Sequence, residues 1–169
     1  MTASRSGRTV VVGLGNPVLT DDRVGLAVAA ALAGLLGESP VEDVDVLTGT
    51  RGGFELLDLL SGYRRAILVD ALTLPHPRPG RVRRLGPDRL AGSARLVNPH
   101  EISLADAFHL AERMSIPMPA SVEILAVEAG DTTTLSEQMT PAVDRVVQPL
   151  ARRIHRMLLP RGRAVLPRR

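Results

Sequence analysis

The stretch Thr9-Val-Val-Val-Gly-Leu-Gly-Asn-Pro-Val-Leu-Thr-Asp-Asp22 decides the fold of this 169-residue chain. Its run of three valines is typical of a strand that is buried on both faces of a sheet. The Gly-Asn-Pro sequence at positions 15–17 then ends the strand. From Asp22 to Leu35, apolar residues recur at helical spacing. The stretch therefore predicts a strand followed by a helix, which is the repeating unit of α/β proteins.

The rest of the chain continues this alternation of strands and helices. Further strands are predicted at 44–47, 66–69, 81–85 (an edge strand) and 122–127, with helices after residues 53, 101 and 140. Pro149 is expected to kink the last helix, because proline removes a backbone hydrogen bond. We predict a doubly wound, three-layer α/β fold, with a mostly parallel, twisted sheet and helices on both faces. Residues 1–160 are expected to form one domain, and 161–169 an arginine-rich flexible tail.

Composition excludes several classes of protein. No apolar run approaches the ~20 residues of a membrane span, and the N-terminus lacks a secretory signal, so we expect a soluble cytoplasmic protein. The chain has no cysteine, which excludes disulfides, thiolate metal sites and a cysteine nucleophile. All 21 basic residues are arginine, and the absence of lysine excludes a Walker loop. With only three aromatic residues to stack on bases, the basic C-terminus does not favour nucleic-acid binding.

Three polar side chains are predicted to lie near one edge of the sheet. Ligands of open α/β sheets bind beyond the carboxyl ends of the strands. Asp22 follows the first strand, Asp70 is predicted to end the third, and His100 lies in a polar turn before a helix. Two carboxylates and one imidazole could bind a divalent transition metal. The competing interpretation is a tight strand-to-helix turn in which an aspartate only caps the helix.

Other functions fit these residues less well. A dinucleotide site is disfavoured because Val18 replaces the third glycine of the fingerprint, and because Asp21 and Asp22 would repel a pyrophosphate. A nucleotide-binding α/β protein is therefore the weakest of the hypotheses. A serine hydrolase is disfavoured because the chain has no Gly-x-Ser-x-Gly elbow.

Four segments, in order along the chain, resemble the motifs of one protein family. Residues 12–25 resemble the N-terminal signature of the hydrogenase maturation endopeptidases, and Leu68-Val-Asp-Ala71 resembles the second acidic motif of that family. Residues 98–106 resemble its histidine motif, and residues 135–143 its C-terminal segment. The resemblance extends from about residue 9 to residue 155.

The resemblance implies a function. Endopeptidases of this family remove a C-terminal extension from the large-subunit precursor of NiFe hydrogenases after nickel insertion. By resemblance, Asp22, Asp70 and His100 occupy both the catalytic and the nickel-contacting positions. The expected enzyme is an aspartic-type or metal-assisted hydrolase, whose nickel is carried by the substrate. We expect a monomer whose partner is the precursor, with no nucleic acid or membrane. The alternative is a non-catalytic metal-checking or chaperone-like module of the same fold.

Three residues depart from the family pattern. Arg23 stands where the family often has glycine, Thr48 where many members have aspartate, and Ala129 where proline is frequent. None of the three belongs to the proposed metal-contacting trio. We expect these departures to mark a divergent subgroup, in which substrate recognition around residues 48–53 differs from that of other members.

Overall fold

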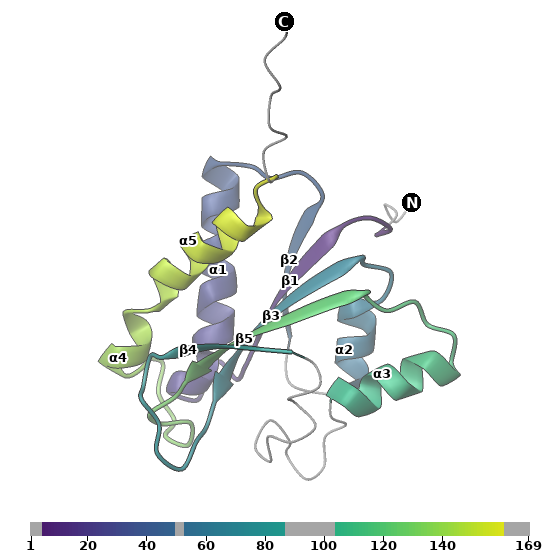
Figure 1. The fold of residues 1–169 in the computed structure, drawn as a ribbon. Helices are drawn as coiled ribbons and strands as arrows, with labels where there is room; N and C mark the ends of the chain where they lie inside the picture. The colour runs from purple at the N-terminus through teal and green to yellow at the C-terminus, as the bar shows by residue number, and fades with distance from the viewer. Residues whose placement is uncertain (1–4, 50–52, 87–103, 161–169) are drawn as a thin grey trace, which may run out of the picture.

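A computed structural model describes residues 5–49, 53–86 and 104–160 of the chain. Within these residues, the centre of the molecule is a sheet of five strands in the order β2-β1-β3-β5-β4 (Figure 1). The strands are β1 (Thr9–Leu14), β2 (Val44–Gly49), β3 (Arg65–Leu72), β4 (Val82–Leu85) and β5 (Ser121–Glu128). All neighbouring pairs are parallel except β4 with β5. The predicted mostly parallel sheet, with its edge strand in the eighties, is confirmed.

Helices cover both faces of this sheet (Figure 1). They are the short 3-10 helix η1 (Asp21–Arg23), α1 (Val24–Glu38), α2 (Gly53–Leu60), α3 (Leu104–Arg113), α4 (Pro141–Asp144) and α5 (Val147–Leu158). One face packs against α1 and α5, and the other against α2 and α3. The predicted three-layer arrangement is therefore confirmed.

The three valines of β1 show why the strand must be apolar on both sides. Alternate side chains of a strand point to opposite faces of the sheet. Val11 belongs to the core beneath α1 and α5, whereas Val10 and Val12 belong to the core beneath α2. All three are fully buried, so both faces of the strand contribute to the hydrophobic stabilisation of the fold.

Two predicted boundaries differ from the structure. Strand β3 does not end at Asp70 but continues to Leu72, because its last two residues pair with Val127 and Glu128 of the longer strand β5. The last helix is interrupted at residues 145–146, one turn before the predicted position at Pro149. The proline has no N–H for the carbonyl four residues earlier, and its ring clashes with that carbonyl, so the break lies upstream of the proline itself.

Other expectations concern segments outside the described residues. The arginine-rich tail at 161–169 is one of them and stays a prediction. In the part of the chain that the structure describes, no helix is both long enough and apolar enough to cross a bilayer.

Two glycines allow α1 to lie directly on the sheet. A Cβ atom added to Gly25, in the first turn of α1, would lie 2.2 Å from the carbonyl oxygen of Leu14 and 2.4 Å from that of Val69. A Cβ added to Gly13, on β1, would lie 2.2 Å from the carbonyl oxygen of Gly25. Since each of these contacts is with backbone, no rotation of a side chain could relieve them. The contact requires glycine at both positions.

Replacing Gly25 with alanine is expected to destabilise the fold by at least about 2 kcal/mol, because the helix would have to move away from two strands. Gly34→Ala is the matched control, since this glycine lies on the same helix and its added Cβ meets nothing within 4 Å. The control is expected to raise the free energy of unfolding by about 0.5–1 kcal/mol. Urea unfolding measures both changes. Equal stability of the two variants would contradict the proposed packing.

Candidate functional site

The loops that follow β1, β3 and β5 lie at one edge of the sheet, because these three strands are parallel. This carboxyl edge carries a group of buried acidic side chains. Asp21 and Asp22 follow β1, Asp70 lies near the end of β3, and Glu128 ends β5. Buried carboxylates are costly unless they are hydrogen-bonded, paired or bound to a metal. The partners of each therefore indicate what it does.

Asp22 is held by the turn that precedes it. One of its carboxylate oxygens accepts a hydrogen bond from the backbone N–H of Asn16 at 3.1 Å. Gly15, at φ +151°, passes so close to Asp22 that an added Cβ would lie 2.0 Å from the Asp22 carbonyl oxygen. The turn therefore folds back over Asp22 and positions its carboxylate. The N-cap position of α1 is occupied by Arg23, whose side chain makes no cap hydrogen bond.

Asp70 lies within β3 and is 4% exposed. Its neighbours Leu68 and Leu72 belong to the core beneath α2, so its side chain points to that face of the sheet. One carboxylate oxygen accepts a hydrogen bond from the N–H of Ala71 at 2.7 Å. This contact fixes the orientation of the carboxylate within a rigid strand.

The structure brings Asp22 and Asp70 onto neighbouring elements. Helix η1, which carries Asp22, contacts β3. Gly25 lies three residues after Asp22 and rests on Val69, the residue before Asp70. The close packing of α1 on the sheet thus carries both carboxylates to the same edge.

His100, the third predicted residue, lies outside the described residues. Among residues 5–49, 53–86 and 104–160, no group of three or more His, Cys, Asp or Glu side chains could hold a metal ion. The position of the imidazole relative to the two carboxylates therefore stays a prediction.

Asp21 is a key residue of this edge that the sequence analysis missed. Its side chain is fully buried and accepts four hydrogen bonds. The donors are the N–H groups of Gly130 (2.8 Å), Asp131 (3.0 Å) and Thr140 (2.7 Å), and the Thr140 hydroxyl (2.9 Å). Asp21 therefore fastens the loop between β5 and α4 onto η1. Its partners are more than 100 positions away in the chain, so no local pattern indicates them.

Glu128 is the second buried carboxylate with a structural role. Burial alone would raise the pKa of Glu128. The N–H of Arg78 (2.6 Å) and the guanidinium of Arg83 (2.7 Å) donate hydrogen bonds to it, and with the nearby arginine charges they hold its pKa below the ordinary value. Glu128 thus stays ionised and ties β4, together with the loop before it, to the end of β5.

The structure describes all three residues that depart from the family pattern, and two of them form hydrogen bonds between segments. The guanidinium of Arg23 donates a hydrogen bond to the carbonyl of Glu137, which links η1 to the segment before α4. The N–H of Ala129 donates to the carbonyl of Leu72 at 2.9 Å, a bond that proline could not make. Thr48 is exposed near the end of β2 and lies beside the undescribed residues 50–52.

Removing the Asp21 carboxylate is expected to destabilise the fold strongly. Asp21→Ala leaves several buried donors without an acceptor and should cost at least about 3 kcal/mol, with a smaller loss for Thr140→Val. Asp58→Ala, an exposed position on α2, is the control and should change stability by less than about 0.5 kcal/mol. Urea unfolding measures all three. An Asp21→Ala variant as stable as the control would show that the four hydrogen bonds contribute little.

Comparison with known proteins identifies the family. The family model of HycI, the hydrogenase maturation protease, matches residues 27–157. The hydrogenase 2 maturation protease of Escherichia coli strain K12 is 26% identical over 164 residues, which cover 95% of this chain and 96% of that protein.

Two solved structures share the fold. The hydrogenase maturating endopeptidase HybD from E. coli superposes with a TM-score of 0.73 at 23% identity, over 89% of this chain and 91% of that one. The hydrogenase maturation protease HycI from Thermococcus kodakarensis KOD1 superposes with a TM-score of 0.65 at 21% identity, over 92% of this chain and 94% of that one.

The matched family model covers most of the chain, including the helices and strands around Asp70. This chain belongs to the hydrogenase maturation protease family.

Proposed function

We propose that this protein is the endopeptidase that removes the C-terminal extension of a NiFe-hydrogenase large-subunit precursor after nickel insertion. We propose further that it recognises the nickel of the substrate through Asp22, Asp70 and His100. Membership of the maturation protease family supports the reaction. The observation that supports the nickel contact is the pair of buried carboxylates on the adjoining elements η1 and β3.

The two carboxylates are suited to complete the coordination of a metal that another molecule carries. A carboxylate has about four acceptor positions on its two oxygens, so each can keep its backbone hydrogen bond while it contacts a cation. The N–H groups of Asn16 and Ala71 donate hydrogen bonds to Asp22 and Asp70 and orient them, as outer partners of metal ligands commonly do. Oxygen ligands without thiolates bind nickel weakly, which suits a metal that stays with the substrate.

His100 would supply the nitrogen ligand from the segment before α3. That helix begins at Leu104, four residues after His100. Helix α3 packs on the same face of the sheet to which Asp70 points. The segment that carries His100 therefore leads into a helix on the same face of the sheet as the Asp70 side chain.

In the proposed mechanism, the contact of Asp22, Asp70 and His100 with the substrate nickel positions the peptide bond that is cut. Contact with the metal would place the scissile peptide at the carboxyl edge, and such positioning contributes several kcal/mol to catalysis. Hydrolysis then requires an activated water. Either Asp22 or Asp70 accepts a proton from that water, or the substrate nickel polarises the scissile carbonyl.

Cleavage is expected to depend on nickel in the substrate and not on metal added to the protease. The test mixes metal-free protease with nickel-loaded and with nickel-free precursor, and follows the shortened large subunit by gel electrophoresis. Only the loaded precursor should be cut, because only it offers the cation that the trio contacts. Equal cutting of both precursors would defeat the proposed recognition. A protease that binds the loaded precursor but never cuts it would instead be a metal-checking module.

Asp70→Asn and His100→Ala are expected to abolish processing while the fold stays intact. Each removes one ligand of the proposed contact, and the asparagine also removes a negative charge. His109→Ala and Asp58→Asn, at exposed positions on α3 and α2, are the matched controls and should process normally. Circular dichroism checks the fold of each variant. Full activity of the His100→Ala variant would exclude the histidine from the site.

The C-terminal tail is expected to be dispensable for cleavage. Deleting residues 161–169 keeps every buried core residue that the structure describes, the last of which is Ile154 on α5. A chain that ends at residue 153 is the contrasting variant and should lose several kcal/mol of stability, because it lacks Ile154. Thermal unfolding and the cleavage assay measure both effects. A normally folded truncation at 160 that no longer cuts the precursor would show that the tail binds the partner.

A further inference from the structure

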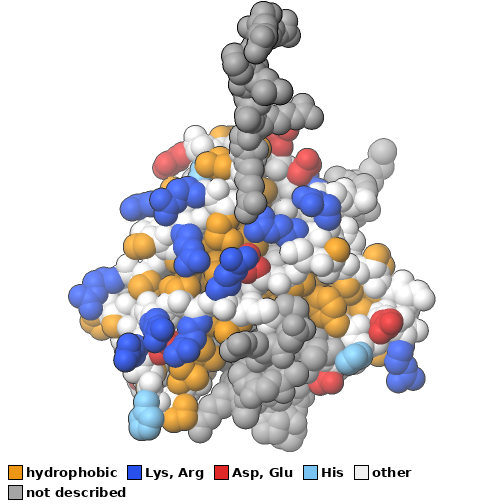
Figure 2. Space-filling model, in the orientation of Figure 1, with side chains coloured by type: hydrophobic (Ala, Val, Ile, Leu, Met, Phe, Trp, Pro, Cys, Tyr) orange, Lys and Arg blue, Asp and Glu red, His pale blue; other side chains and the backbone are white. Residues whose placement is uncertain are grey.

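A cavity of about 930 Å³ lies at the edge of the sheet opposite to Asp22 and Asp70. Its walls come from the starts of β1, β2 and β3 and from the C-terminal end of α5. Five arginines from separate parts of the chain line it: Arg64, Arg65, Arg84, Arg153 and Arg156. In Figure 2, blue side chains predominate over α5 and β4, and few red ones accompany them. The cavity is therefore distinct from the proposed cleavage site and opens on a basic surface.

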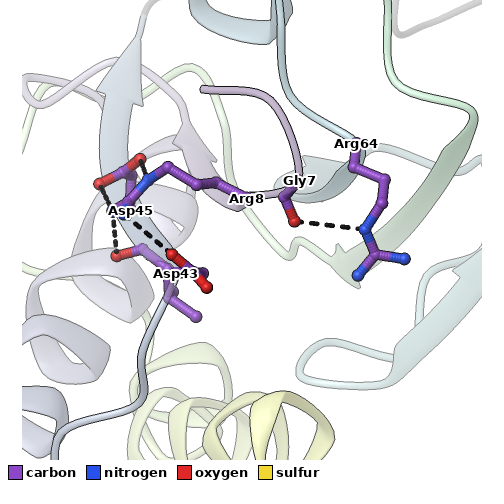
Figure 3. Close-up of polar contacts among 6 residues, drawn as sticks. Gly7, Arg8, Asp43, Asp45 and Arg64 are labelled. Atoms are coloured by element: carbon purple, nitrogen blue, oxygen red, sulfur yellow. Dashed lines mark hydrogen bonds and ion pairs between the residues drawn. The ribbon is translucent and has the colours of Figure 1, made fainter. Parts of the chain in front are cut away.

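Three carboxylates, Glu42, Asp43 and Glu123, line this cavity beside the five arginines, and the last two form ion pairs. Glu123 lies 2.8 Å from the guanidinium of Arg84 and 3.8 Å from that of Arg65. Asp43 lies 3.4 Å from the guanidinium of Arg8 (Figure 3). These pairs stabilise the walls of the cavity but neutralise only part of its positive charge.

Three of the arginines keep their charge available to a ligand. Arg64, Arg153 and Arg156 are exposed, and none forms an ion pair with a carboxylate of the described residues. The Nε of Arg64 donates to the carbonyl of Gly7 at 3.2 Å, which holds this side chain in place (Figure 3). Arg153 and Arg156 are three residues apart on α5 and therefore lie on one face of the helix. Together the three form a basic cluster, with Arg64 directly before β3 and the other two on α5.

The backbone around this cluster differs from that of a phosphate site at a helix N-terminus. Phosphate sites commonly use backbone N–H groups at a helix N-terminus, whereas the helix end at this cavity is the C-terminus of α5, which carries a partial negative charge. Nearby backbone donors are also occupied: the N–H of Thr9 donates to the carbonyl oxygen of Asp43, and the N–H of Arg64 donates to that of Arg8. Recognition must therefore come from the planar guanidinium groups, which pair bidentately with a carboxylate or a phosphate, so that the apolar part of the lining decides which ligand fits.

The apolar side chains of the cavity favour a peptide. Met157, Leu158 and Leu159 line it beside the arginines, and Leu159 is 43% exposed. No aromatic residue is among the described residues that line the cavity, so it offers no stacking surface for nucleic-acid bases. A ligand that combines acidic and apolar side chains complements both parts of the surface.

We propose that this cavity binds an acidic peptide segment of a protein partner. The carboxylates of the segment would pair with Arg64, Arg153 and Arg156, and an apolar side chain would rest on residues 157–159. Because the cavity is at the edge of the sheet opposite to Asp22 and Asp70, a partner held here leaves the proposed cleavage site accessible. The binding is independent of the proposed nickel contact.

The test measures binding of a fluorescein-labelled peptide of three Glu-Glu-Leu repeats to the full-length protein by fluorescence anisotropy. The double variant Arg153→Gln/Arg156→Gln should weaken binding about tenfold or more, because it removes two charge-assisted pairs. Arg145→Gln/Arg152→Gln removes the same charge outside the cavity, from the break between α4 and α5 and from α5, and should stay within about twofold of wild type. The same peptide with Gln in place of Glu should bind at least about tenfold more weakly.

Equal weakening by the two double variants would overturn the proposal, since it would show only general attraction to a basic surface. Tighter binding of tripolyphosphate or of a short single-stranded RNA than of the acidic peptide would also overturn it. Urea midpoints equal to that of the wild type establish that both double variants are folded. The nickel-dependent cleavage assay is a separate measurement, so its failure leaves this result standing.

Discussion

The close contact between α1 and the sheet at Gly13 and Gly25 is the constraint on which the other features depend. It brings the backbone of the helix against the carbonyl oxygens of Leu14 and Val69. Any side chain at these glycines would move the start of α1, and with it η1, away from β3. Asp22 and Asp70 would then no longer share an edge. The glycines of the N-terminal signature therefore determine the geometry of the acidic pair, although neither bears a functional group.

Two further buried carboxylates, Asp21 and Glu128, fix the loops at that edge of the sheet. Asp21 fastens the β5–α4 loop to η1, and Glu128 fastens β4 and the preceding loop to β5. Both are acceptors of several hydrogen bonds, which offset the cost of burying their charge. Adjacent aspartates in the sequence thus have different roles, since Asp21 holds the scaffold and Asp22 occupies the candidate site.

The fold could be predicted from the sequence wherever a local pattern determines the structure. The valine run of β1 and the turn at 15–17 are such patterns, and they predicted the first strand and helix correctly. The end of β3 could not be predicted, because the length of that strand depends on pairing with β5, more than 50 residues away. For the site, the sequence indicated Asp22 and Asp70 at one edge. It did not indicate Asp21, whose partners come from residues 130–140 and depend on the tertiary fold.

The position of Asp70 within the sheet has a consequence for local stability. Strand β3 is paired on both sides, with β1 and with β5, so moving Asp70 requires opening the centre of the sheet. Core strands of this kind open with a free energy close to that of global unfolding, so slow amide hydrogen exchange is expected there. Asp22 belongs instead to η1, a single turn of 3-10 helix that follows β1. The position of Asp70 therefore depends on the whole sheet, whereas that of Asp22 depends on the few contacts that hold η1, chiefly the hydrogen bonds of Asp21.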